Sequence, residues 1–171
     1  MQVSVFVGMS IDGFIARPDG RLDFLSPFEG EEHGYEEHMK SIDALVVGRA
    51  TWETVQGFAA WPWTGRRVIV LTHRPLDAAH GEETHSGQLA PLAARLASEG
   101  IAHIYLDGGI AIRCGLDEDL VDDMTISLVP RTIGQGIRLF AGAQPTTTAW
   151  RLSRVNRFSS GVVQVRWERA R

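Results

Sequence analysis

The fold of this chain is decided by the stretch Asp43-Ala44-Leu45-Val46-Val47-Gly48-Arg49-Ala50-Thr51-Trp52-Glu53. Its apolar first half is typical of a buried strand, and the residues after Gly48 suit a helix. A strand that turns so sharply into a helix exposes backbone N–H groups at the helix start, here beside the guanidinium of Arg49. The stretch therefore indicates an anion-binding turn, although a glycine that only makes the turn is an equally simple interpretation.

Two later strand-like runs end in residues of the same kind. Residues 68–71 lead to Thr72, His73 and Arg74, and residues 104–107 lead to the double glycine at 108–109. Because ligands of open α/β sheets bind at the carboxyl ends of the strands, these ends predict one extended ligand with phosphate groups lying across them. A solvated turn before Pro75 remains the alternative for residues 72–74.

Strand and helix patterns alternate along the first two thirds of the chain, and antiparallel strands follow. We expect strands near 3–7, 44–47, 67–71, 102–106 and 121–129, and helices near 31–41, 50–56, 88–99 and 110–115. Residues 149–158 and 162–168 alternate on either side of a turn and predict a C-terminal hairpin. The pattern predicts one α/β domain over residues 1–171, with a mixed sheet flanked by helices.

Composition narrows the class of protein. The chain has 171 residues, 44% of them hydrophobic, and a net charge of −4, which gives no general attraction to nucleic acid or to anionic membranes. We therefore expect a small-molecule substrate as partner, with no nucleic acid and no membrane. The start of the chain lacks the pattern of a signal peptide, and no apolar run approaches the ~20 residues of a membrane helix, so we expect a cytoplasmic protein.

Cysteine and histidine give little sign of metal or disulfide chemistry. Cys114 is the one cysteine, which excludes an internal disulfide, and its apolar neighbours favour a buried thiol over a nucleophile. None of the six histidines forms a His-x-x-x-His pair. We therefore expect no metal site.

Several short motifs together carry a family resemblance. They are Ser10-Ile11-Asp12-Gly13-Phe14-Ile15-Ala16, residues 47–53, Leu71-Thr72, Gly108-Gly109, and Leu120-Val121-Asp122-Asp123 leading to Pro130, Gly134, Gly136 and Leu139-Phe140. In this order and spacing the chain resembles the dihydrofolate reductase-like superfamily, and more closely the reductase domain of riboflavin biosynthesis, over nearly its whole length. The resemblance implies a dihydrofolate reductase-like three-layer α/β fold, with a mostly parallel central sheet, and a homodimer.

The resemblance also implies an NADPH-dependent reductase that transfers a hydride to a small planar heterocycle, pyrimidine-, pterin- or folate-like. Residues 7, 15 and 16 would border the nicotinamide, residues 48–51 the pyrophosphate and adenosine side, residues 72–74 the ribose 2′-phosphate, and residues 108–112 would close over the pyrophosphate. The expected cofactor-binding residues are Val7, Ile15, Ala16, Gly48, Arg49, Ala50, Thr51, Leu71, Thr72, His73, Arg74, Asp107, Gly108, Gly109, Ile110, Ala111 and Ile112. Small glycines and a hydroxyl–guanidinium pair independently suit phosphate groups.

The proton donor is less readable. Related folate reductases use a carboxylate on the helix before the Gly-Arg strand, and a gapless count from Gly48 reaches Glu32, with Glu36 nearby. The competing interpretation is an acidic, solvated helix face. Asp12 is a third catalytic candidate, which a role in a turn before Gly13 would equally explain.

Two features leave the function open. Riboflavin-pathway reductases typically carry a basic residue where this chain has Phe14, so the riboflavin substrate is in doubt. A non-catalytic NADPH-binding sensor on the same fold is the alternative to an enzyme, and a structural protein whose glycines only make turns is a third possibility.

Overall fold

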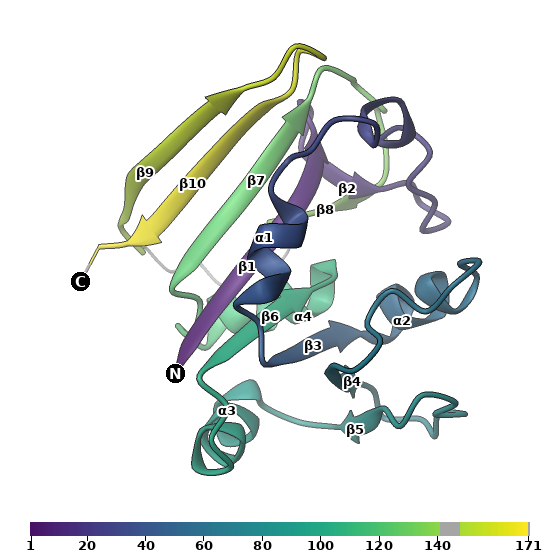
Figure 1. The fold of residues 1–171 in the computed structure, drawn as a ribbon, viewed down its shortest axis with the longest axis vertical. Helices are drawn as coiled ribbons and strands as arrows, with labels where there is room; N and C mark the ends of the chain where they lie inside the picture. The colour runs from purple at the N-terminus through teal and green to yellow at the C-terminus, as the bar shows by residue number, and fades with distance from the viewer. Residues whose placement is uncertain (141–147, 171) are drawn as a thin grey trace.

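The computed structural model describes residues 1–140 and 148–170 and is built around one large sheet. Its strands are β1 (Gln2–Ser10), β3 (Ala44–Gly48), β4 (Arg67–Leu71), β5 (Glu83–His85), β6 (His103–Asp107), β7 (Asp123–Val129), β9 (Trp150–Arg157) and β10 (Val163–Arg169). Their order is β5-β4-β3-β6-β1-β7-β10-β9 (Figure 1). The pairs from β5 to β7 are parallel, whereas β10 runs antiparallel to both β7 and β9.

This topology confirms the expected mixed, mostly parallel sheet with a C-terminal antiparallel hairpin. A second, two-stranded sheet pairs β2 (Phe14–Ala16) with β8 (Ile137–Arg138) in antiparallel fashion. It ties the segment after β1 to the segment after β7.

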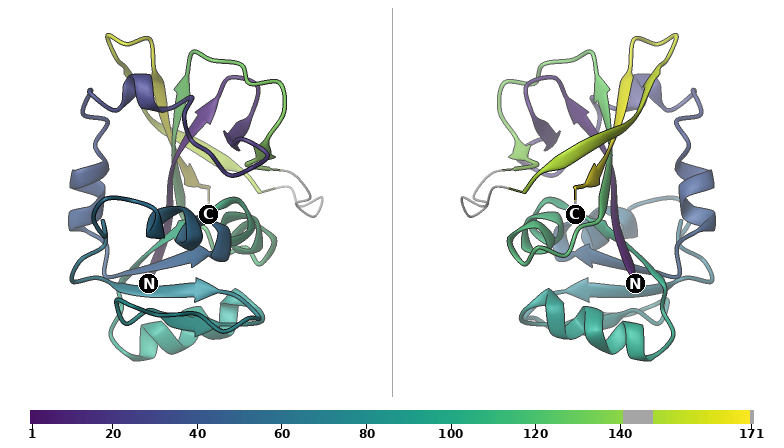
Figure 2. Two further views of the ribbon diagram at one scale, coloured as in Figure 1. Left: turned by 90° about the vertical axis from the view of Figure 1, so that its right-hand side faces the viewer. Right: turned by 90° about the vertical axis from the view of Figure 1, so that its left-hand side faces the viewer.

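Helices cover both faces of the large sheet, which gives the three-layer fold. They are α1 (Tyr35–Lys40), α2 (Arg49–Gln56), α3 (Leu89–Ser98) and α4 (Gly109–Asp117), with a 3-10 turn, η1 (Ser26–Phe28). Buried residues of α1 and α2 pack in one core with β3 and β4, and those of α3 and α4 pack in a second core with β1, β3 and β6. Figure 2 shows helices on both sides of the sheet. The amphipathic pattern of 88–99 correctly predicted a helix with one buried face, which is α3.

Two expected elements differ from the observed ones by three or more residues at one end. The helix expected from residue 31 begins at Tyr35, because Gly34 is left-handed (φ 85°) and the Glu31 carboxylate instead accepts hydrogen bonds from Ser159 and Ser160. The first strand continues past Val7 to Ser10, since β7 pairs with it along that whole length. Both differences come from partners more than a hundred positions away in the chain.

The central position of β1 sets up the site. It lies between β6 and β7, so its carboxyl end opens beside the end of β6 and the start of α4, where open α/β sheets bind ligands. Over the residues that the structure describes, no helix is long and apolar enough to span a membrane.

Candidate functional site

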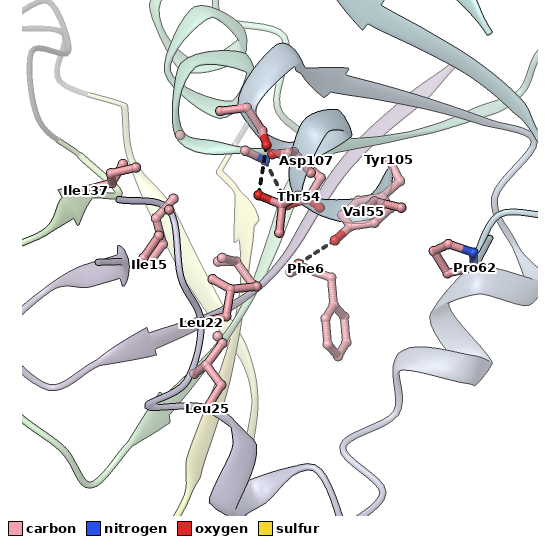
Figure 3. A pocket seen from close by; sticks show the side chains of 18 of the residues that line it. Phe6, Ile15, Leu22, Leu25, Thr54, Val55, Pro62, Tyr105, Asp107 and Ile137 are labelled. Atoms are coloured by element: carbon pink, nitrogen blue, oxygen red, sulfur yellow. Dashed lines mark hydrogen bonds between the residues drawn. The ribbon is translucent and has the colours of Figure 1, made fainter. Parts of the chain in front are cut away.

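A pocket of about 370 Å³ lies at the carboxyl ends of β1 and β6 (Figure 3). Strand β1, the small β2–β8 sheet, the loop before η1, helix α2 and the loop after it all contribute to its wall. The lining residues are Phe6, Val7, Gly8, Ile15, Ala16, Gly20, Leu22, Leu25, Tyr35, Ala50, Thr51, Thr54, Val55, Phe58, Pro62, Trp63, Tyr105, Asp107, Gly108, Gly109 and Ile137. Eight of the expected cofactor residues are among them: Val7, Ile15, Ala16, Ala50, Thr51, Asp107, Gly108 and Gly109.

The pocket is mainly apolar and has two distinct ends. Ile15 and Ile137 lie together at one end in Figure 3, and Pro62 lies at the other. Between them, the Tyr105 hydroxyl donates a hydrogen bond to the backbone carbonyl of Phe6 at 2.8 Å. Because this hydroxyl already donates its hydrogen bond to β1, Tyr105 contributes its ring to the pocket lining. The mainly apolar lining suits a flat apolar ring.

Gly108 brings the turn after β6 against the start of α2. Its φ of 93° is in the left-handed region that favours glycine, and a Cβ built on it would clash with the hydroxyl of Thr51. The same Cβ would lie 3.5 Å from the backbone nitrogen of Gly48. The double glycine and the Gly-Arg turn therefore meet, and each brings the start of a helix to the same place, a geometry suited to a pyrophosphate.

Asp107 is the carboxylate of this pocket, and within the described lining it is the sole Asp or Glu side chain. It ends β6, and its Oδ1 accepts a hydrogen bond from the backbone N–H of Gly108 at 2.8 Å. Desolvation by the surrounding protein raises its pKa to about 6, and the Gly108 bond offsets only part of that effect. A carboxyl group with this pKa exchanges its proton close to neutral pH.

A second cluster of expected residues forms beside the pocket, where β3 and β4 end. Arg49 donates from Nη1 to the Thr72 hydroxyl at 3.1 Å and to the carbonyl oxygens of Arg74 and Pro75 at 3.4 and 3.2 Å. Its Nε donates to Glu53 at 2.7 Å, and the Arg74 guanidinium lies 3.9 Å from that same carboxylate. The structure thus brings a hydroxyl and two guanidinium groups together, with one carboxylate between the cations.

The remaining expected cofactor residues fall into two groups. Gly48, Leu71 and His73 belong to the two strand ends that form this cluster, outside the lining of the pocket. Ala111 and Ile112 are fully buried in α4, and Ile110 is 60% exposed on the same helix. Side chains 111 and 112 therefore hold α4 against the sheet, and only the backbone of this turn faces the pocket.

The three expected catalytic carboxylates lie elsewhere. Asp12 accepts hydrogen bonds from the backbone N–H groups of Ile133 and Gly134, and hydrogen bonding, first from the Ser10 side chain and then from this backbone, lowers its pKa. Glu32 accepts from the backbone N–H of Gly34, and Glu36 is exposed on α1. None of the three is in the described lining of the pocket. Asp12 joins the loop after β1 to the loop after β7, a long-range contact that differs from the local turn expected before Gly13.

Sequence reasoning missed most of the apolar wall. The lining residues outside the expected site are Phe6, Gly8, Gly20, Leu22, Leu25, Tyr35, Thr54, Val55, Phe58, Pro62, Trp63, Tyr105 and Ile137. Two signals were present, since Thr54 and Val55 lie one turn after the expected Ala50 and Thr51, and Tyr35 lies on the helix expected before β3. The loop residues 20–25 carry no periodic pattern that would place them.

Trp52, Phe14 and Cys114 are held by contacts within the fold. Trp52 is buried and donates from Nε1 to Glu82 at 2.8 Å. Phe14 is buried, and the Arg138 guanidinium stacks over its ring at 4.4 Å. A positive charge therefore lies beside the position at which riboflavin-pathway reductases typically carry a basic residue. Cys114 packs against the core, and desolvation raises its pKa. In the described part of the chain, no three His, Cys, Asp or Glu side chains are grouped to hold a metal ion.

Comparison with known proteins identifies a family that matches most of the chain and a relative that shares much of its sequence. A family model described as the RibD C-terminal domain matches residues 1–164. The uncharacterized protein YwjB of Bacillus subtilis (strain 168) is 32% identical over 142 residues, which cover 80% of each chain.

Solved structures share the fold. A Shewanella sp. PV-4 protein, provisionally described as a riboflavin biosynthesis protein, is 31% identical, with a TM-score of 0.90 and full coverage of both chains. A Thermotoga maritima deaminase/5-amino-6-(5-phosphoribosylamino)uracil reductase aligns over 99% of this chain and 56% of its own, with 16% identity and a TM-score of 0.74. Enterococcus faecalis dihydrofolate reductase, complexed with NADP(H), aligns over 99% and 97%, with 17% identity and a TM-score of 0.67.

Proposed function

This chain belongs to the RibD C-terminal domain family, and from that premise we propose that it is an NADPH-dependent reductase of a small planar heterocycle. The proposal rests on one observation: the apolar pocket, the starts of two helices and the carboxylate of Asp107 meet at the ends of β1, β3 and β6. A flat ring, a diphosphate and a proton each have a suitable environment there. Reductases of this family and the related dihydrofolate reductase fold make this chemistry the natural assignment.

The residues present suit an NADPH molecule lying across the strand ends. Gly108 fits against Thr51 only because it lacks a Cβ, and the turn leaves backbone N–H groups at the starts of α2 and α4 for phosphate oxygens. Thr72, Arg49 and Arg74 supply a hydroxyl and guanidinium groups for a 2′-phosphate. Val7, Ile15 and Ala16 would border the nicotinamide ring, which when bound supplies the hydride.

Reduction of a ring C=N bond also needs a proton, and Asp107 is the group placed to hold it. Its carboxyl lines the pocket and, with a pKa of about 6, is partly protonated near neutral pH. The Gly108 N–H donates to one oxygen of this carboxyl group at 2.8 Å and so holds its orientation. The apolar wall excludes water from the ring face, which favours transfer to the substrate over loss to solvent.

Thermal unfolding with and without nucleotide tests the cofactor proposal. We expect saturating NADPH to raise the melting temperature clearly more than NADH does, because a ligand bound to the folded state stabilises it by mass action. Arg74→Ala and Thr72→Val should shrink the difference between the two nucleotides. Arg151→Ala, on the far strand β9 and paired with Glu168, is the matched control and should leave it unchanged. No shift with saturating NADPH would refute the proposal.

A non-catalytic NADPH-binding protein is the second candidate, and one observation favours it. All three carboxylates expected to assist catalysis, Asp12, Glu32 and Glu36, lie outside the described pocket lining. Such a protein would bind NADPH but would not oxidise it against dihydrofolate, pterins, pyrimidines or quinone-like compounds. Steady consumption of NADPH with any of these substrates rejects this candidate in favour of the enzyme.

Assembly and location complete the proposal. We propose a homodimer, as the family resemblance implies, formed through the outer hairpin, where Leu152 and Val155 of β9 are 46% and 48% exposed. A cytoplasmic location and the absence of nucleic-acid and membrane partners remain predictions from the sequence.

A further inference from the structure

A second hollow, of about 790 Å³, lies between α1 and the outer strands of the sheet. In Figure 1, α1 lies over β1, and β10 and β9 continue beyond it. The hollow is bordered by the exposed end of α1 on one side and by β7, β10 and β9 on the other. Its volume is within the range of small-molecule sites. Phe6 is the one lining residue that the hollow has in common with the reductase pocket, and the other lining residues of the two cavities differ.

Two arginines stand opposite each other on the sheet side of this hollow. Arg166 of β10 pairs in register with Arg154 of β9, and Gln164 pairs with Asn156 two positions away. Because cross-strand partners share a face, all four belong to the face that lines the hollow. Like charges directly opposite on neighbouring strands destabilise a sheet, so this pair needs a compensating partner.

The described residues compensate these cations only in part. Arg166 lies 3.3 Å from Asp123, but its Nε is buried and, among described residues, without a hydrogen-bond acceptor. No described side chain forms an ion pair with Arg154, which is exposed. The positive charge of this pair, which lines the hollow, is therefore only partly balanced by the described side chains.

The carboxylates on the α1 side of the hollow are already engaged, and one histidine there is neutral. Glu37 pairs with Lys40 at 2.8 Å, and Glu32 accepts the backbone N–H of Gly34. Burial lowers the pKa of His38 to about 4, so its ring is neutral at pH 7. Asp123 of β7 is the acidic group on the sheet side of the hollow, where it pairs with Arg166, whereas Glu32 and Glu37 border the hollow from the α1 side.

We propose that this hollow is a second binding site, for a small molecule that carries phosphate groups, with Arg154 and Arg166 as its anchors. Paired guanidinium groups with free N–H donors match phosphate oxygens in charge and geometry. The Asn156 side chain, which donates to Gln164 at 3.2 Å, lies beside them as a further polar contact. This proposal goes beyond the reductase function and does not depend on it.

NMR titration of the labelled full-length chain with inorganic pyrophosphate, at constant ionic strength, tests the site. We expect saturable shifts of the side-chain amide signals of Asn156 and Gln164 and of the β9 and β10 backbone. A parallel titration with ribose 5-phosphate shows whether an organic phosphate ester binds in the same place. Shifts confined to Gly108, Gly109 and α2 would place the anion in the cofactor pocket instead and overturn the proposal.

Substitutions separate the hollow from the rest of the surface. Arg154→Gln, at an exposed position that the fold does not need, should weaken pyrophosphate binding at least tenfold. Arg151→Gln lies on the same strand but pairs with Glu168 outside the hollow, so it should bind as the unsubstituted chain does. Equal binding by both variants, or a changed molecular mass for Arg154→Gln with no change in binding, would overturn the site.

Discussion

At the scale of single residues, Asp107 is where stability and chemistry conflict. Its carboxylate lies in a wall that is otherwise mostly apolar, and a hydrogen bond from Gly108 offsets part of its loss of hydration. A pKa of about 6, against an ordinary 3.8, means that the folded state favours the protonated form. The ionised carboxylate of Asp107 therefore destabilises the folded state, and such destabilising groups are common at functional sites.

Asp107→Asn should make the protein more stable above pH 6 and less active. The raised pKa gives the native acid extra stability that is complete below about pH 4 and is lost as the pH rises through about 6. The amide cannot ionise, so it avoids a cost of up to about 3 kcal/mol at pH 8 while still accepting the Gly108 N–H.

Urea unfolding at pH 4, 6 and 8 measures this effect. The difference between variant and parent should be small at pH 4 and largest at pH 8, and turnover of NADPH should fall by two orders of magnitude or more. Asp122→Asn, a carboxylate at the opposite end of the sheet that accepts from the Val3 N–H, serves as the control for general charge effects. A constant stability difference at all three pH values contradicts the assignment.

The sequence identified some residues of the site but not all of their contacts or properties. The sequence singled out the Gly108-Gly109 pair and the residues of the Arg49–Thr72–Arg74 cluster, because glycines, a hydroxyl and guanidinium groups at strand ends suit phosphate groups. Asp107 was expected as a cofactor contact, but its raised pKa depends on packing that no local pattern reports. Asp12 bonds to residues 133 and 134, a contact that only the folded chain brings about.

At the scale of elements, the start of α3 depends on the end of α4. The Gln88 side chain makes no capping bond, and the Glu118 carboxylate instead accepts the backbone N–H groups of Leu89 and Ala90 at 2.8 and 2.7 Å. A carboxylate at this position satisfies two otherwise unpaired donors and complements the helix dipole. One side chain thereby joins two helices on the same face of the sheet.

Glu118→Ala should lower the free energy of unfolding by about 1–2 kcal/mol, because both helix N–H groups lose a charged acceptor. For a chain of this length, that corresponds to a fall in melting temperature of about 3–8 °C. Calorimetry checks the value. Glu36→Ala, on the exposed side of α1, is the matched control and should change stability by less than about 0.5 kcal/mol; equal effects of the two variants would contradict the capping role.

Elements with strong periodicity were predictable, and those made by distant partners were not. The helix expected at 88–99 is α3 within one residue at each end, because its apolar stripe alone specifies it. Strand β5 was missed, since Glu83-Thr84-His85 is short and polar and is a strand only through its pairing with β4. Helix α1 is shorter than expected because residue 31 binds the hairpin turn at 159–160.

At the scale of the whole molecule, the hairpin leaves one edge of the sheet open. Strand β9 is the last strand of the order, and Val155 pairs with Val165, which places both on the face opposite the Arg154–Arg166 pair. An exposed edge with apolar side chains is a common site of self-association. Val155 also lines the second hollow, so a dimer formed through this edge would border that hollow.

Light scattering after size exclusion should therefore give twice the mass of one chain. Val155→Lys should shift the mass to that of one chain, because a charged side chain on an edge strand opposes sheet-to-sheet contact. Arg151→Lys keeps the charge of the strand and should leave the dimer intact. A single-chain mass for the unsubstituted protein at all concentrations would show that the edge has no partner of its own kind.

The architecture as a whole was predictable from the order of its motifs, whereas the strand order was not worked out from pattern alone. Alternating strands and helices specify a parallel sheet flanked by helices, and residues 149–168 specify a hairpin. Which strand lies between which others depends on non-local pairing, and that pairing decides which strand ends meet at the pocket.

The place of β1 in that order has a consequence for biosynthesis. Gln2 pairs with His103 and Ser4 with Asp123, so in a chain made from its amino terminus β1 leaves the ribosome long before either neighbour exists. Its buried valines remain uncovered throughout that interval, and long-range pairing of this kind is slow. We expect the nascent chain to depend on chaperones that bind apolar segments until β7 has emerged.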